Sequence, residues 1–145
     1  MSDDQARILQ SDPTVFEVAI DLIGNRPPLN ANDRLHWRQK SGVTHVVRTT
    51  TAWRVKSLGL PAAAHLTVQL HFETGDNRKR RDPANLCATS KPAIDGLVDA
   101  GLVPDDSPEW VTELMPLIHK GAPMHGQRGL WLQVTVHRAE GSEAA

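Results

Sequence analysis

The chain has 145 residues, of which 39% are hydrophobic and 23% are charged. This length and composition are typical of one globular domain with a substantial core. Apolar runs of about 18 residues and an apolar leader are both missing, so the sequence predicts neither a membrane span nor a secretory signal, and we expect a cytoplasmic protein. The single cysteine, Cys87, excludes an internal disulfide and a multi-cysteine zinc site.

Charge is distributed unevenly along the chain. The formal net charge is −1, yet residues 26–91 contain twelve Lys or Arg against four Asp or Glu, a local balance of +8. Residues 1–25 carry −4 and residues 92–145 carry −5. Because the screening length at physiological salt is about 8 Å, a polyanion responds to this local field rather than to the total charge. The middle of the chain could therefore bind a polyanion, or it could be a solvated charged surface balanced by acidic flanks.

Four strands are predicted, and in three of them, over residues 15–23, 65–72 and 129–136, apolar and polar residues alternate. The remaining strand spans residues 110–118. The first 14 residues lack this periodicity and are expected to be a flexible leader, and residues 139–145 are expected to be a flexible tail. We therefore predict one α/β domain over residues 15–138, with a mixed β-sheet flanked by helices.

Two helices are predicted between the strands. The first spans residues 43–58, with an expected apolar face of Val46, Val47, Thr50, Trp53 and Leu58. Three cations are expected to point away from that face: Arg48, Arg54 and Lys56. The second helix spans residues 90–100, with Ser90 as the N-cap and Gly101 as the C-terminal stop. Its expected buried stripe is Ile94, Leu97 and Val98, and Lys91 could pair with Asp95 four residues later.

Carboxylates flank this second helix. Asp82 follows a cationic block made of Arg78, Lys79, Arg80 and Arg81, and Asp105 and Asp106 follow the helix. Carboxylate oxygens are the ligands that Mg²⁺ prefers, and Arg and Lys suit a phosphate backbone, so the combination suggests metal-assisted phosphodiester chemistry. The alternative is that these Asp residues only cap helices or lie in solvated turns.

A loop before the first helix carries groups that could grip nucleic acid. Its amides, cations and aromatic ring are Asn30, Asn32, Arg34, Trp37, Arg38 and Lys40. Such groups contact phosphates and stack on exposed bases. Alternatively, Trp37 anchors the loop to the core.

The order of these motifs resembles the RusA family of Holliday-junction resolvases, which is common in bacteriophages and prophages. The resemblance covers residues 15–138, and its most specific part is RRDPANL followed by KPAIDGLVDAGLVPDD. Lys91, Asp95, Gly101 and Asp106 keep the family's mutual spacing. The resemblance implies a homodimeric α/β fold that binds four-way DNA junctions and makes paired nicks with Mg²⁺ in recombination and repair.

The resemblance also implies roles for individual residues. Asp82, Lys91 and Asp106 match the family's catalytic residues, with Asp82 and Asp106 as metal ligands and Asp105 as a further one. Asn85 matches a frequent companion and joins the expected DNA contacts, which are Asn30, Arg34, Trp37, Arg38, Lys40, Arg78, Lys79, Arg80 and Arg81. We expect Asp82 and Asp106 at the same end of the helix-and-sheet layer, with a cation or Lys91 between them.

The chain departs from the family pattern in two places. Ala84 stands where the D-x-D-N motif has its second Asp, and three extra residues precede Lys91. Three functions therefore remain open: an active Mg²⁺-dependent junction endonuclease, a junction-binding protein with weak or no cleavage, and a partner-binding protein without a DNA role.

Overall fold

The computed structural model describes residues 5–74, 81–120 and 129–139. In this part of the chain, five strands form one sheet in the order β1-β2-β5-β3-β4. The strands are β1 (Ala6–Ser11), β2 (Thr14–Ile20), β3 (His65–Thr74), β4 (Val111–Lys120) and β5 (Gly129–His137). β3 and β4 are parallel and the other neighbours are antiparallel, so the predicted mixed α/β domain is confirmed.

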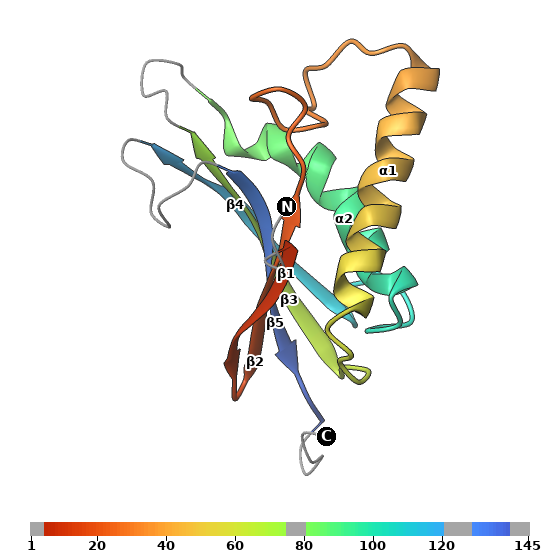
Figure 1. Ribbon diagram of the computed structural model, residues 1–145, viewed down its shortest axis with the longest axis vertical. Helices are drawn as coiled ribbons and strands as arrows, with labels where there is room; N and C mark the ends of the chain where they lie inside the picture. Colours follow the sequence, from red (N-terminus) through yellow and green to blue (C-terminus); the bar gives the residue numbers. More distant parts are fainter. Residues whose placement is uncertain (1–4, 75–80, 121–128, 140–145) are drawn as a thin grey trace.

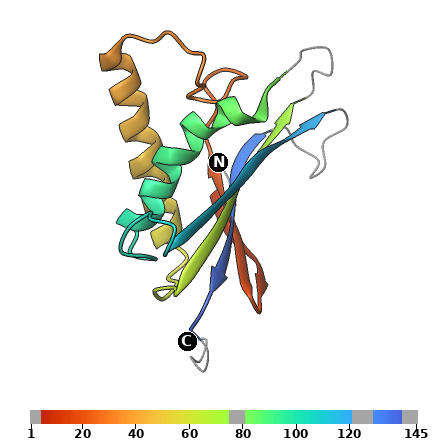
Figure 2. The same ribbon diagram turned by 180° about the vertical axis from the view of Figure 1, so that it is seen from behind.

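Two α-helices and one short 3-10 helix complete the fold. They are α1 (Trp37–Lys56), η2 (Pro83–Leu86) and α2 (Cys87–Asp99). Figure 1 and the reverse view in Figure 2 show that α1 and α2 both cover the same face of the sheet. No helix in the described ranges is long and apolar enough to cross a membrane.

The core lies between this helix layer and the sheet. Alternate residues of the three central strands are buried there: Phe16, Val18, Leu66, Val68, Leu70, Leu132 and Val134. Ile94 and Leu97 of α2 pack against them, which confirms most of the predicted stripe of that helix. Because period-two alternation places these residues on one face, the strands were predictable from the sequence.

The contact between α1 and α2 depends on a glycine. A Cβ atom built on Gly96 would lie 2.7 Å from the carbonyl oxygen of Arg48 and 2.8 Å from the Cβ of Thr51. One turn away, the guanidinium of Arg48 donates to both carboxylate oxygens of Asp99, at 2.6 and 2.9 Å. The two helices therefore approach at backbone distance and are tied by a bidentate ion pair.

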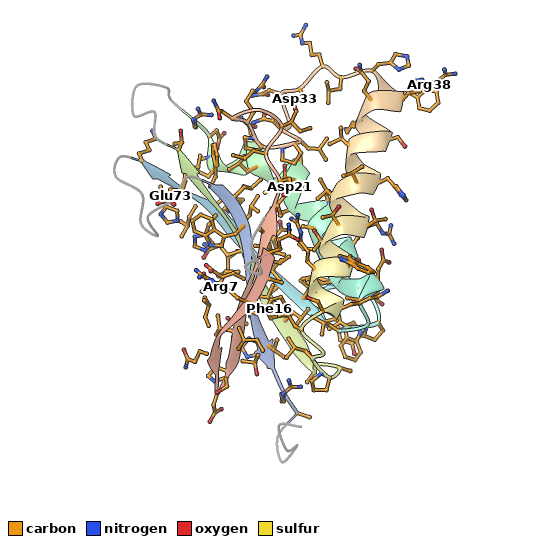
Figure 3. The ribbon with its side chains drawn as sticks, viewed as in Figure 1. Arg7, Phe16, Asp21, Asp33, Arg38 and Glu73 are labelled. Atoms are coloured by element: carbon orange, nitrogen blue, oxygen red, sulfur yellow. The ribbon has the colours of Figure 1, made fainter. Side chains whose placement is uncertain are left out.

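The buried face of α1 differs from the prediction. Trp53 is 76% exposed, whereas Arg54, expected to point to solvent, is 6% exposed. The Arg54 guanidinium donates to the carbonyl oxygen of Ala19 at 2.7 Å and to both carboxylate oxygens of Asp21 at 3.1 Å. Figure 3 shows Asp21 at the end of β2, beside α1. These partners compensate the buried charge, so the helix buries Arg54 and exposes the larger apolar Trp53.

Three predicted boundaries are also wrong. Residues 6–11 form β1 instead of belonging to a flexible leader, because an edge strand with mostly exposed residues shows no apolar alternation. α1 begins at Trp37, six residues before the predicted start at residue 43. α2 begins at Cys87, so Ser90 lies inside the helix, where its hydroxyl donates to the carbonyl oxygen of Leu86 rather than capping the end. Gly101, with φ of +87°, is the predicted stop.

We expect Gly96→Ala to destabilise the protein by about 1–3 kcal/mol, since the new methyl group would collide with the backbone of α1. The matched control is Gly42→Ala, within α1, where a Cβ atom would meet nothing within 4 Å. That change should leave stability equal or raise it by up to about 1 kcal/mol. Chemical denaturation of both variants measures the difference, and equal midpoints would contradict the close contact.

Candidate nucleic-acid and metal site

A polar pocket of about 180 Å³ opens beside the start of the helix pair η2 and α2. Four residues selected from the sequence for DNA contact or metal binding line it: Asn30, Arg81, Asp82 and Asn85. Asn32 and Arg26 lie on its wall, and Phe72 of β3 and Ile118 of β4 are among its apolar lining residues. Segments about 50 residues apart in the chain therefore contribute to one polar cavity.

Local backbone chemistry positions Asp82. It is the N-cap of η2, and its Oδ1 atom accepts a hydrogen bond of 3.0 Å from the backbone N–H of Ala84. Pro83 follows at the first helical position, where a missing N–H group costs nothing. The capping role given by the alternative interpretation is thus present, and the exposed carboxylate also faces the pocket.

Hydrogen bonds at two points hold the loop that carries Asn30 against η2 and α2. The buried Thr89 hydroxyl donates to the carbonyl oxygen of Leu29 at 2.6 Å and accepts from its N–H at 3.2 Å. The N–H of Ala31 donates to the carbonyl oxygen of Asn85 at 3.0 Å. The Asn30 side chain in turn accepts from the N–H of Asn32 at 2.9 Å. The amide wall of the pocket is therefore held by hydrogen bonds on both sides.

Arg81 adds positive charge to the pocket, beside Arg26. Its guanidinium carbon lies 5.4 Å from the centre of the Phe72 ring, a cation–π contact that orients the group. Its Nε atom is buried and has no hydrogen-bond partner among the described residues. The phosphate-binding capacity of Arg81 therefore depends on the guanidinium as a charged group lining the pocket, and not on the buried Nε donor.

Lys91 forms a second group of charges at the outer side of α2. Its Nζ atom donates to Asp95 Oδ1 at 2.9 Å, which confirms the predicted pair, and also to Asp106 Oδ2. The Asp106 contact and then the Asp95 contact raise the pKa of Lys91, and Lys91 lowers the pKa of Asp106. Lys91 is therefore a fully charged ammonium group at neutral pH, placed between two carboxylates.

Asp105 has a separate role in the turn beyond α2. Its Oδ1 atom accepts from the N–H of Ser107 at 2.7 Å, and the hydrogen bonds from Ser107 lower the pKa of its carboxyl group. Asp105 and Asp106 do not line the polar pocket. The carboxylates expected together thus belong to two groups, Asp82 in the pocket and Asp106 beside Lys91.

The donor set at Asp82 is compatible with Mg²⁺. No three His, Cys, Asp or Glu side chains within the described ranges are grouped to hold one metal ion. Mg²⁺, however, commonly takes one or two carboxylates and completes its shell with water. Asp82 and the amide oxygens of the pocket are oxygen donors of the kind that this ion prefers, so a hydrated Mg²⁺ fits the residues present.

Glu113 is a charged neighbour that sequence spacing did not identify. The surrounding protein desolvates its carboxyl group and raises its pKa, while a hydrogen bond from Ser90 and the charge of Lys91 act in the opposite direction. The pKa of the Cys87 thiol is raised as well. Burial of the thiol is the largest cause, and the negative charges of Glu113 and Asp82 add to it. Because Glu113 lies on β4, only the tertiary structure brings it to the beginning of α2.

The other predicted DNA contacts that the structure describes do not line the pocket. Trp37 is 68% exposed at the start of α1, so the alternative that it anchors the loop in the core is wrong. The guanidinium of Arg38 lies 5.3 Å from the Trp37 ring centre, and Figure 3 shows Arg38 at the outer end of α1. Arg34 and Lys40 are exposed nearby. Arg78, Lys79 and Arg80 fall outside the described residues.

No model of a known protein family matches the chain, and a search of curated proteins found no significant match.

The raised pKa of Glu113 has a measurable effect on stability. A carboxyl group whose folded-state pKa exceeds its unfolded value, here 4.5, costs stability as the pH rises through the folded pKa. For the monomeric chain we therefore expect Glu113→Gln to raise the melting temperature at pH 7, and the gain to disappear below about pH 4, where both states are largely protonated. Thermal unfolding across this range tests it, with Glu109→Gln on the exposed turn as the control. A pH-independent gain would contradict this account.

Proposed function

We propose that this protein is a Mg²⁺-dependent, structure-specific endodeoxyribonuclease of the RusA type, acting on four-way DNA junctions as a homodimer. One observation carries the proposal. Asn30, Arg81, Asp82 and Asn85 were selected from the sequence for DNA or metal contact, and they come from two distant segments, yet all four line one polar pocket. The pocket therefore combines a carboxylate, a guanidinium and two amides, which are groups that suit a metal ion and a phosphate.

Each group in the pocket has a chemical task under this proposal. Arg81 binds a phosphate of the DNA backbone, because its guanidinium is charged, lines the pocket and is oriented by Phe72. The amides of Asn30 and Asn85 orient the sugar-phosphate chain. Asp82 holds Mg²⁺ together with water, and a bound Mg²⁺ supplies an activated water molecule and charge neutralisation at the phosphate.

Lys91 provides the second cation of the proposed site. Its ammonium group is held at the outer side of α2 by Asp95 and Asp106. In this position it stabilises the negative charge that develops on the scissile phosphate or on the leaving oxygen. The role of Asp106 under this proposal is therefore to hold Lys91 in position and to keep it charged.

A junction-binding protein with weak or no cleavage is the second candidate. Ala84 supplies no carboxylate at the position where the resembled family has one. The described residues also contain no three-ligand group that would hold a metal without several waters. DNA binding through Arg81 and the amides would persist in this case, and cleavage would be slow.

Cleavage assays on a four-way junction with Mg²⁺, beside binding assays in EDTA, distinguish the two candidates. We expect the parent to nick the junction and Asp82→Asn to lower the rate by about 100-fold or more while binding is retained, since the change removes a charge and preserves size. Glu109→Gln is the control and should cleave like the parent. Binding without cleavage by the parent would favour the second candidate, and neither binding nor cleavage would contradict both.

The phosphate contact of Arg81 predicts a change in salt dependence. We expect Arg81→Gln to weaken junction binding and to reduce the slope of log affinity against log salt by about 0.9 per site. Arg7→Gln is the control, because Figure 3 shows Arg7 on the side of the sheet away from the helices. Equal slopes for parent and Arg81→Gln would show that Arg81 contacts no phosphate.

A further inference from the structure

The two edges of the sheet differ in their capacity to pair with another strand. β1 has six residues, and its register with β2 is broken by an irregularity between Ile8 and Gln10. β4 has ten residues and, in the described part of the chain, pairs only with β3, with a register shift of its own between Leu114 and Leu117. The two edges therefore differ in length rather than in regularity. The outer edge of β4 presents a long row of backbone donors and acceptors, which is a template for a further strand.

The side chains of β4 are unusual for a solvent-facing edge. Leu114, Met115 and Leu117 are 43%, 58% and 43% exposed. Edge strands normally carry charges near their middle to prevent association, and here the charges stand nearer the ends, as Glu113 and Lys120. No ion pair joins Lys120 to another residue within the described ranges.

This arrangement is self-complementary under a two-fold axis. Glu113 is in register with Val68 and Lys120 with Thr74, and these β3 residues share one face of the sheet, so Glu113 and Lys120 lie on the same face of β4. In an antiparallel pair of two β4 strands, Glu113 of each copy can stand opposite Lys120 of the other. The axis then lies between Pro116 and Leu117, with Leu117 opposite Pro116, Met115 opposite Ile118 and Leu114 opposite His119 of the other copy.

We propose that β4 is the homodimer interface, pairing antiparallel with β4 of a second copy to join the two sheets. Pro116 lacks an N–H group, which edge strands tolerate, so it weakens this ladder at one point without preventing it. The identity of the partner rests on the proposed function, because two nicks in one junction require two sites related by a two-fold axis. The pairing also places Lys120 of the partner copy close to Glu113, the desolvated carboxylate beside Lys91.

A competing apolar surface lies on the other side of the molecule. A groove of about 610 Å³ runs along α1, with Val46 and Ile23 exposed on its wall. Two ion pairs at this groove, Arg54 with Asp21 and Arg26 with Asp33, are satisfied within the chain. Arg38 also lines the groove, but no unpaired acidic residue among its lining residues could meet Arg38 of a second copy, so the groove lacks the opposite charges of β4 and serves as the control surface.

Oligomeric state without DNA tests the proposal independently of cleavage. By sedimentation or light scattering at micromolar concentration we expect a dimer for the parent and a monomer for Leu117→Lys, whose new charges would meet at the axis. Val46→Lys on α1 should remain a dimer. A monomeric parent, or dissociation by Val46→Lys and not by Leu117→Lys, would overturn the proposal, and a dimer that fails to cleave DNA would leave it standing.

Exchanging the charges of Glu113 and Lys120 tests the register of the proposed β4–β4 pair. This test compares three variants, so it does not depend on the folding of any one of them. Glu113→Lys and Lys120→Glu should each weaken the dimer about tenfold, because each places like charges opposite one another at two symmetric points. The double variant, with both changes, restores opposite charges and should restore the parent dissociation constant. Additive weakening in the double variant would overturn this pairing of Glu113 with Lys120.

Discussion

The close contact of α1 with α2 at Gly96 is the constraint on which the rest of the structure depends. A side chain at this position would meet the backbone of α1, so only glycine lets the two helices lie together over one face of the sheet. The Arg48–Asp99 ion pair ties the same contact, and Arg54 ties α1 to the end of β2. Both links use charged groups whose partners are supplied within the chain, which keeps the cost of covering them low.

The position of α2 decides where the chemistry can occur. α2 continues directly from η2, so the capped turn at Asp82 and the ammonium group of Lys91 belong to one continuous helical segment. The Thr89–Leu29 hydrogen bonds attach the amide-bearing loop to that segment. The polar pocket and the Lys91 group thus share a rigid support, although Asp82 and Asp106 are in separate groups. Glu113 of β4 interacts electrostatically with Cys87, next to the pocket, and with Lys91. It is therefore close to both groups.

Much of the fold could be predicted, and the errors have identifiable causes. The central strands β2, β3 and β5 were found because burial on one side imposes alternation of residue type. β1 has almost no buried residues, so it left no such pattern. The predicted buried face of α1 was wrong because hydrophobicity alone favours burying Trp53. In the structure, the carbonyl oxygen of Ala19 and the carboxylate of Asp21 provide hydrogen-bond partners for a buried Arg54. Partners more than 30 residues away are not visible in a local pattern.

The sequence by itself determined two helices and four of the five strands, the Lys91–Asp95 pair and the residue types available for binding phosphate and metal, since these depend on neighbours within a few positions. The tertiary structure decided that Asn30 meets Asp82 in one pocket, that Asp106 contacts Lys91, and that Glu113 joins them. It also decided that β4 is an edge strand and not a central one. These features depend on strand order and register and on helix packing, which arise from contacts between distant segments and leave no periodic signal in the chain.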